Sequence, residues 1–210
     1  MIKAILFDMD GVLIDAKQWH YEALNQALGL FGHNISPADH LEKYDGLPTR
    51  KKLDMLTLER GLPAGAHEYI STMKQMYTLD KINANCKPIP IHQYAVSRLR
   101  TEGYKLAVCS NSVKETVETA MDKAGLTQYF EFMLSNQDVE KSKPDPEIYN
   151  LAINRLGFAP TECLIIEDNE NGIKAAVASG AFMLKVDTVY DVTYDNIKNK
   201  IITVERSITR

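Results

Sequence analysis

Two acidic residues, Asp8 and Asp10, come directly after an apolar run near the start of the chain, in the stretch LFDMDGV. The run from Ala4 to Phe7 is typical of a buried strand, so we expect both carboxylates where that strand leaves its sheet. Two like charges this close resist ionising together, so one can act as a nucleophile while the other carries a proton. A D-x-D pair alone is more often a solvated turn, and the rest of the chain must decide between these interpretations.

Polar residues also follow two later strand patterns. Ser110 and Asn111 come after the pattern from Lys105 to Cys109 and offer a hydroxyl, an amide and free helix N–H groups to an anion. Taken alone, the same pair is a good helix N-cap. Lys143 lies in the stretch KSKPDP, where two prolines fix the backbone just before a helix. A lone loop lysine is usually solvated, so its role depends on what faces it.

The apolar pattern from Cys163 to Ile166 runs straight into two adjacent acids, Glu167 and Asp168. Acids at the end of a buried strand predict a metal site rather than a charged turn. Because oxygen donors without His or Cys favour Mg²⁺ over zinc, we expect Mg²⁺ as the cofactor.

Gathered at one edge of a sheet, these groups fit a phosphoryl-transfer reaction. Asp8 would attack phosphorus and form an aspartyl phosphate. Mg²⁺, Lys143 and the Ser110 hydroxyl would neutralise the charge on the equatorial oxygens. Asp10 would protonate the leaving oxygen and then deprotonate the water that releases phosphate.

The remaining sequence predicts the elements that position these groups. After Asp15, apolar residues at helical spacing and punctuating prolines predict only helices, one of them from Pro63 to about Leu79. From Pro88 onward the pattern alternates between helix and strand, as in a parallel sheet with right-handed crossovers. The predicted helices are 92–102, 113–124, 146–156 and 172–179, and the predicted strands are 105–110, 132–135, 163–167 and 182–186. We therefore predict an α/β fold, with a Rossmann-like parallel sheet core (1–15 and 86–210) and an inserted all-helical cap domain (16–85, the cap).

Composition narrows the class of protein. A chain of 210 residues with 45% hydrophobic content can bury a substantial core, and a net charge of −4 makes nucleic acid a poor partner. No apolar run reaches the roughly 18 residues that a membrane span requires, and no targeting signal is recognisable, so we expect a cytoplasmic protein without membrane partners. The three cysteines Cys86, Cys109 and Cys163 lack disulfide or zinc spacing.

The motifs resemble, in order and spacing, the four sequence motifs of the haloacid dehalogenase superfamily. These are Asp8-Met9-Asp10-Gly11-Val12, Ser110-Asn111, Lys143-Pro144-Asp145-Pro146 and Glu167-Asp168. The resemblance implies a Rossmann-like core, a helical cap after the first motif and a Mg²⁺-dependent phosphatase or phosphomutase. It also implies Asp8 as nucleophile, Asp10 as acid/base, and metal binding by Asp8, the Asp10 carbonyl, Glu167 and Asp168. The founding dehalogenases lack an acid at position 10 and need no metal, so this chain departs from them.

Within that superfamily the sequence is similar to the β-phosphoglucomutase-like phosphatases, which also carry a histidine early in the cap, like His20. The stretch from Asp45 to Arg50 resembles their specificity loop, which makes Arg50 or Lys51 a candidate for binding a second anionic group. The mutases have a threonine at the position of Ala16, and its absence here argues against mutase activity.

We therefore expect a Mg²⁺-dependent phosphatase of small phosphorylated metabolites, such as sugar or polyol phosphates. Ser110, Asn111 and Lys143 would bind the phosphate, and His20 and Arg50 would face the substrate from the cap. The alternatives are a β-phosphoglucomutase-type phosphomutase and a catalytically dead protein that senses phosphate or binds a partner. We expect a monomer.

Overall fold

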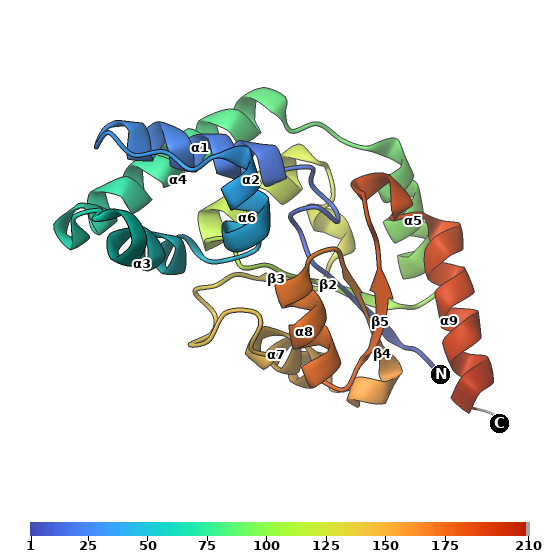
Figure 1. Cartoon of the computed structure of the whole chain (residues 1–210). Coiled ribbons are helices and arrows are strands. Elements are labelled where there is room, and N and C mark those ends of the chain that lie inside the picture. The colour runs from blue at the N-terminus through green and yellow to red at the C-terminus, as the bar shows by residue number, and fades with distance from the viewer. Residues whose placement is uncertain (209–210) are drawn as a thin grey trace.

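A five-stranded parallel sheet forms the centre of the computed structural model, which describes residues 1–208 (Figure 1). The strands are β1 (Ala4–Phe7), β2 (Lys105–Cys109), β3 (Phe132–Leu134), β4 (Cys163–Glu167) and β5 (Phe182–Lys185). They pair in the order β3-β2-β1-β4-β5. The chain thus moves outward from β1 to β3 and then returns to the other side of β1. This reversal puts a switch point between the carboxyl ends of β1 and β4, where such folds bind ligands.

Helices cover both faces of this sheet, so the predicted α/β fold is confirmed. On one face, α5 (Pro90–Thr101), α6 (Lys114–Lys123) and α9 (Tyr194–Ile208) pack on alternate strand residues such as Ile5 and Phe7. On the other face, α7 (Glu147–Leu156) and α8 (Glu170–Ala178) pack on the intervening residues such as Leu6. Because both faces are covered, the strands read as continuous apolar runs rather than as alternating patterns.

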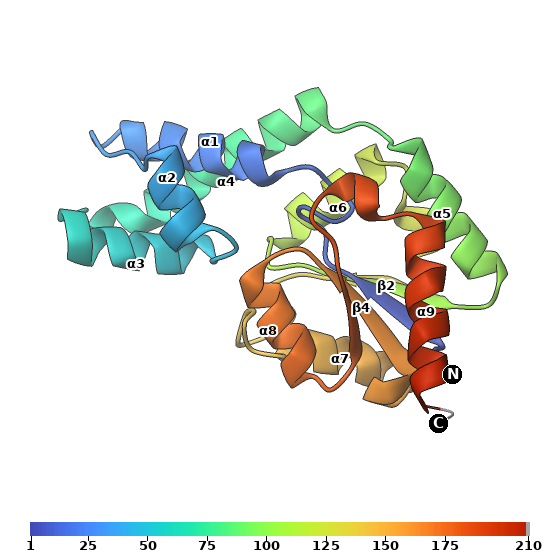
Figure 2. The same ribbon diagram turned by 45° about the vertical axis from the view of Figure 1, so that its right-hand side comes forward.

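The segment predicted as the cap contains helices joined by loops, without a strand, and lies to one side of the sheet (Figures 1 and 2). It contains α1 (Lys17–Gly29), α2 (Pro37–Asp39), a π-helical turn (His40–Tyr44), α3 (Thr49–Arg60) and α4 (His67–Asn85). These helices bury a hydrophobic cluster of their own, which includes Leu24, Leu28, Leu53, Leu56 and Ile70. We propose the division into a core of residues 1–15 and 86–210 and a cap of residues 16–85, and this separate cluster supports it.

The helices differ from the sequence prediction at several points. Helix α8 begins at Glu170 rather than Gly172, because the Asn169 side chain caps it by accepting a hydrogen bond from the Gly172 N–H at 3.0 Å. Helix α4 continues to Asn85, well past Leu79. Helix α9 was not predicted, although its buried Ile197, Ile201 and Val204 recur at helical spacing. Over residues 1–208, the helices are all too short or too polar to cross a membrane.

Candidate active site

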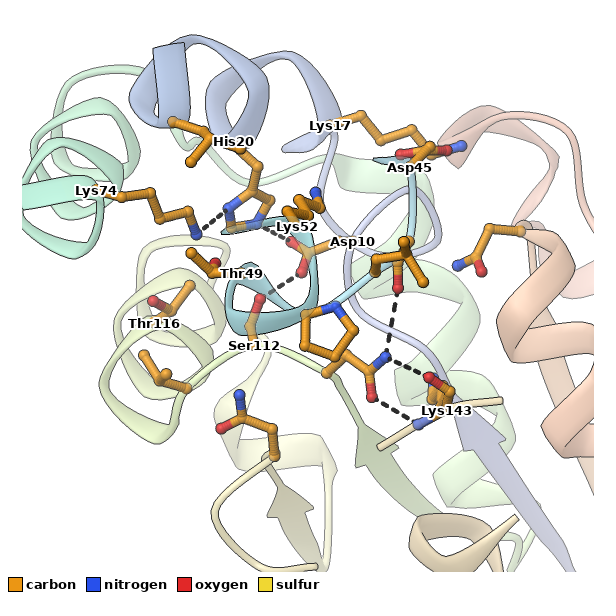
Figure 3. A pocket seen from close by; sticks show the side chains of 18 of the residues that line it. Asp10, Lys17, His20, Asp45, Thr49, Lys52, Lys74, Ser112, Thr116 and Lys143 are labelled. Atoms are coloured by element: carbon orange, nitrogen blue, oxygen red, sulfur yellow. Dashed lines mark hydrogen bonds and ion pairs between the residues drawn. The ribbon is translucent and has the colours of Figure 1, made fainter. Parts of the chain in front are cut away.

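A cavity of about 180 Å³ opens between the cap and the carboxyl ends of the strands (Figure 3). Four of the predicted site residues reach it from the core, namely Asp8, Asp10, Asn111 and Lys143. The predicted cap residue His20 reaches it from α1. The structure therefore brings together residues that are as far apart in the sequence as Asp8 and Lys143. The ends of β1 and β2 lie side by side, and the loop after β3 places the Lys143 ammonium against the Cys109 carbonyl at the end of β2.

Lys143 is the electrostatic centre of the buried part of the site. Its Nζ donates hydrogen bonds to Asp8 Oδ1 at 2.7 Å, to Glu167 Oε1 at 2.7 Å and to the Cys109 carbonyl at 2.8 Å. The Tyr149 hydroxyl also donates to Glu167 Oε1, at 2.6 Å. Desolvation acts to lower the pKa of Lys143, but the two carboxylates outweigh it and raise that pKa, so the ammonium stays charged.

Asp8 has a pKa well above its usual value, because burial disfavours its charge and Lys143 only partly compensates. Asp10 behaves in the opposite way. Its Oδ2 accepts a hydrogen bond from the Ser112 hydroxyl at 2.7 Å, and its Oδ1 lies 3.1 Å from His20 Nε2. Burial acts to raise the pKa of Asp10, but His20, Ser112 and Lys74 together hold it below its usual value. In the protein alone, Asp10 is therefore the more readily ionised carboxyl of the two.

Asp168 lies beside Asp8 and Glu167, and each offers an oxygen within 4.8 Å of the other two. Three carboxylates this close suit a hard divalent cation such as Mg²⁺. The backbone leaves room for them: Gly11 has φ +92°, and a Cβ there would lie 2.2 Å from Asp168 Oδ2. The Lys17 Nζ also lies 2.5 Å from Asp168 Oδ2. The donor set and its glycine-lined space therefore fit the expected metal.

Ser110 and Asn111, both predicted to bind phosphate, hold the loops around the cavity. Ser110 is fully buried and its hydroxyl accepts a hydrogen bond from the Ser112 N–H at 3.0 Å. Asn111 accepts from the Lys143 N–H at 3.1 Å and donates to the Lys143 carbonyl at 3.3 Å. Its Nδ2 also lies 3.5 Å from the Gly46 carbonyl, so it connects the core loop to the cap. The phosphate-binding roles of these residues stay predictions.

The structure does not bring Arg50 to this cavity. Arg50 and its neighbour Lys51 are exposed on α3 and line a separate cleft with the loop that contains Pro144. Two cap lysines that the sequence analysis did not select, Lys52 on α3 and Lys74 on α4, line the cavity instead. Ser112 and Lys17 were also not selected, although they contact Asp10 and Asp168.

Comparison with known proteins assigns this architecture to a family. The model of the haloacid dehalogenase-like hydrolases matches residues 5–186. The chain therefore belongs to the haloacid dehalogenase-like hydrolase family, which confirms the family predicted from the four motifs.

Several relatives are named as phosphatases. The chain is 26% identical to the phosphorylated carbohydrates phosphatase of Thermotoga maritima over 195 residues, covering 92% of this chain and 86% of the relative. It is 29% identical to the phosphoglycolate phosphatase of Aquifex aeolicus over 179 residues, covering 85% and 82%. Among solved structures, β-phosphoglucomutase from Clostridium difficile superimposes with a TM-score of 0.84 at 22% identity, covering 100% of both chains. That last similarity shows the shared fold.

Proposed function

We propose that this protein is a Mg²⁺-dependent phosphatase of small phosphorylated metabolites, in particular sugar or polyol phosphates. The observation that carries the proposal is the pairing of two carboxylates in one cavity at the switch point of the sheet. Asp8 lies 2.7 Å from the Lys143 ammonium, while Asp10 is held separately by Ser112 and His20. The names of the relatives support the substrate class, and the cavity of about 180 Å³ suits a small substrate.

In this proposal the residues divide the reaction between them. Asp8 attacks phosphorus, the ester oxygen leaves, and an aspartyl phosphate forms on Asp8. Asp10 gives a proton to the leaving oxygen and later takes one from the water that attacks the aspartyl phosphate. A bound phosphate ester brings negative charge close to Asp10, which raises its pKa and favours the protonated form that the first step needs.

Lys143 keeps Asp8 fixed for attack and offers positive charge to the phosphoryl oxygens. Asp8, Glu167, Asp168 and the Asp10 carbonyl would hold Mg²⁺, as the family resemblance implies. When bound, the metal supplies charge that neutralises the transferring phosphoryl group and favours ionised Asp8. A cytoplasmic location and a monomeric state stay predictions from the sequence.

Phosphate release from a panel of sugar and polyol phosphates tests the proposal. The wild type should release inorganic phosphate, and Asp8→Asn should reduce turnover to background. Acid quenching during turnover should trap phosphate on Asp8, identified by peptide mapping. Labelling of any other residue would refute the nucleophile assignment, and an absence of turnover and labelling would favour the catalytically dead alternative.

The mutase alternative is tested with a single substrate. Ala16 is buried at the position where the mutases carry threonine, so it offers no hydroxyl to restrain Asp10. We therefore expect β-glucose 1-phosphate to give free phosphate rather than glucose 6-phosphate, followed by ³¹P NMR. Ala16→Thr should slow hydrolysis of the phosphoenzyme. Glucose 6-phosphate as the main product would establish a mutase instead.

A further inference from the structure

Two lysines of the cap point into the active-site cavity from different helices (Figure 3). Lys52 belongs to α3 and is only 8% exposed. Among residues 1–208, no group accepts a hydrogen bond from its ammonium or forms an ion pair with it within 4.0 Å. Lys74 belongs to α4, and its Nζ lies 3.2 Å from His20 Nδ1, which is a neutral partner rather than an anion.

Nearby carboxylates compensate the charge of these ammonium groups only in part. Desolvation lowers the pKa of Lys52 to about 8, although the charges of Asp45 and Asp10 act to raise it. Desolvation also lowers the pKa of Lys74 to about 8, and repulsion from Lys52 adds to this effect. Near neutral pH both side chains are still charged, so the cavity holds two cations that repel each other.

The other carboxylates nearby already have partners. Asp8 and Glu167 share Lys143, Asp168 pairs with Lys17, and Asp10 is bound by Ser112 and His20. The cavity lining also includes neutral hydrogen-bonding side chains, namely Thr49, Ser71, Gln75 and Thr116, and the carboxylate of Asp45, which lies 3.8 Å from His40 Nε2. An anion placed here would thus meet two ammonium groups that have no anionic partner within 4.0 Å among residues 1–208, together with neutral donors.

We propose that Lys52 and Lys74 form a subsite for a second anionic group of the substrate, a phosphate or a carboxylate. The inference rests on the proposed phosphatase function, since it places that group on the same molecule as the ester attacked by Asp8. Only the His20 ring separates Lys74 from Asp10, which contacts the leaving oxygen in the proposed reaction. The second anionic group is therefore a few bonds from that oxygen. This subsite takes the role that the sequence analysis gave to Arg50 or Lys51.

Two matched substrate pairs test the subsite. The second anionic group is a phosphate in one pair and a carboxylate in the other. One pair is fructose 1-phosphate and fructose 1,6-bisphosphate, and the other is 2-hydroxyethyl phosphate and phosphoglycolate. In each pair the second compound adds one anionic group to a closely similar carbon skeleton. The wild type, Lys52→Met and Lys74→Met are compared by kcat/KM, with Lys51→Met as the control because it removes the same charge from the exposed face of α3.

The wild type should prefer the doubly anionic compound of at least one pair, and that pair identifies the group. Lys52→Met should lower kcat/KM for that compound about 10- to 100-fold, the effect of one charge-assisted hydrogen bond, and by less than about threefold for its partner. Lys74→Met should lower kcat/KM for both compounds, because Lys74 also contacts His20 beside Asp10, but about 10-fold more for the doubly anionic compound. Lys51→Met should change neither. Equal loss on both compounds, or no preference in the wild type for either pair, would overturn the subsite.

Two further measurements separate the possible failures. Hydrolysis of p-nitrophenyl phosphate, which carries no second anionic group, tests the phosphatase function alone. Titration calorimetry with the same pairs in EDTA measures binding without turnover, so the subsite is tested even if no phosphate is released. Tighter binding of the doubly anionic compound that is lost in Lys52→Met and Lys74→Met supports the subsite, and equal binding refutes it. Circular dichroism verifies that each variant is folded.

Discussion

Replacing Lys143 with methionine tests how the buried charges are balanced. The Lys143, Asp8 and Glu167 side chains are 2%, 6% and 0% exposed, and both ion pairs measure 2.7 Å. Removing one member of a buried ion pair costs about 3 to 5 kcal/mol, because the remaining charge is left uncompensated. Here two carboxylates lose their cation at once. We therefore expect Lys143→Met to lose about 3 to 5 kcal/mol of unfolding free energy at pH 7.5, or roughly 6 to 20 °C in melting temperature.

The sign of the pH dependence follows from the same carboxylates. Without Lys143, the folded variant relieves the repulsion between Asp8 and Glu167 by binding a proton that the unfolded chain does not bind. A folded state that binds more protons gains stability as the pH falls. The difference in unfolding free energy between the wild type and Lys143→Met should therefore become smaller as the pH falls from about 8 to about 5, since the carboxyls of the unfolded chain titrate only near pH 4.

Urea denaturation in EDTA, followed by circular dichroism at several pH values, measures both effects. Lys141→Met is the control, because Lys141 is exposed in the same loop. A loss below about 1 kcal/mol for Lys143→Met, or a deficit that is independent of pH, would show that the network does not hold the fold as we argue.

Three other outcomes are expected. Lys52→Met should be more stable than the wild type by up to about 3 kcal/mol at pH 7. Folded Lys52 loses its proton near pH 8 and the unfolded lysine only near pH 10.5, so the stability of the wild type rises across that interval. The stability difference between Lys52→Met and the wild type should therefore vanish above about pH 10. A difference that stays constant with pH in urea titrations would contradict this. Gly11→Ala should cost more than about 1 kcal/mol in the same assay, since its φ is +92° and its Cβ would clash with Asp168; an unchanged midpoint would show that the turn adapts. EDTA should abolish turnover, Ca²⁺ should substitute poorly, and Asp168→Asn should remove the rise in melting temperature produced by Mg²⁺; full activity in excess EDTA would refute the metal.

The core of the fold could be predicted because local signals and tertiary structure agree there. The strand 163–167 is an apolar run that the structure reproduces residue for residue as β4. Each predicted core residue ends a strand or follows one, and parallel strands bring their carboxyl ends to one edge of the sheet. Asp8, Asp10, Asn111 and Lys143 therefore reach one cavity.

The cap residues were harder to predict because a helix has no equivalent of a strand end. Arg50, Lys51 and Lys52 follow one another, and only the orientation of α3 decides that Lys52 alone faces the cavity. A usable signal existed on α4, where Lys74 falls in the row of buried residues Ile70, Thr78 and Ile82 at intervals of four. A lysine in such a row is turned toward the interior.

The two buried lysines Lys143 and Lys52 show why burial alone does not define a role. Both have their charge removed from water, yet Lys143 has two carboxylate partners and Lys52 has none within ion-pair distance among residues 1–208. The partners make removal of Lys143 destabilising, whereas removal of Lys52 relieves an uncompensated charge and should stabilise the protein. A side chain that lowers stability and fixes no neighbour has no structural role to perform. Opposite signs for the two variants would therefore separate a lysine that organises the site from one that is available to a ligand.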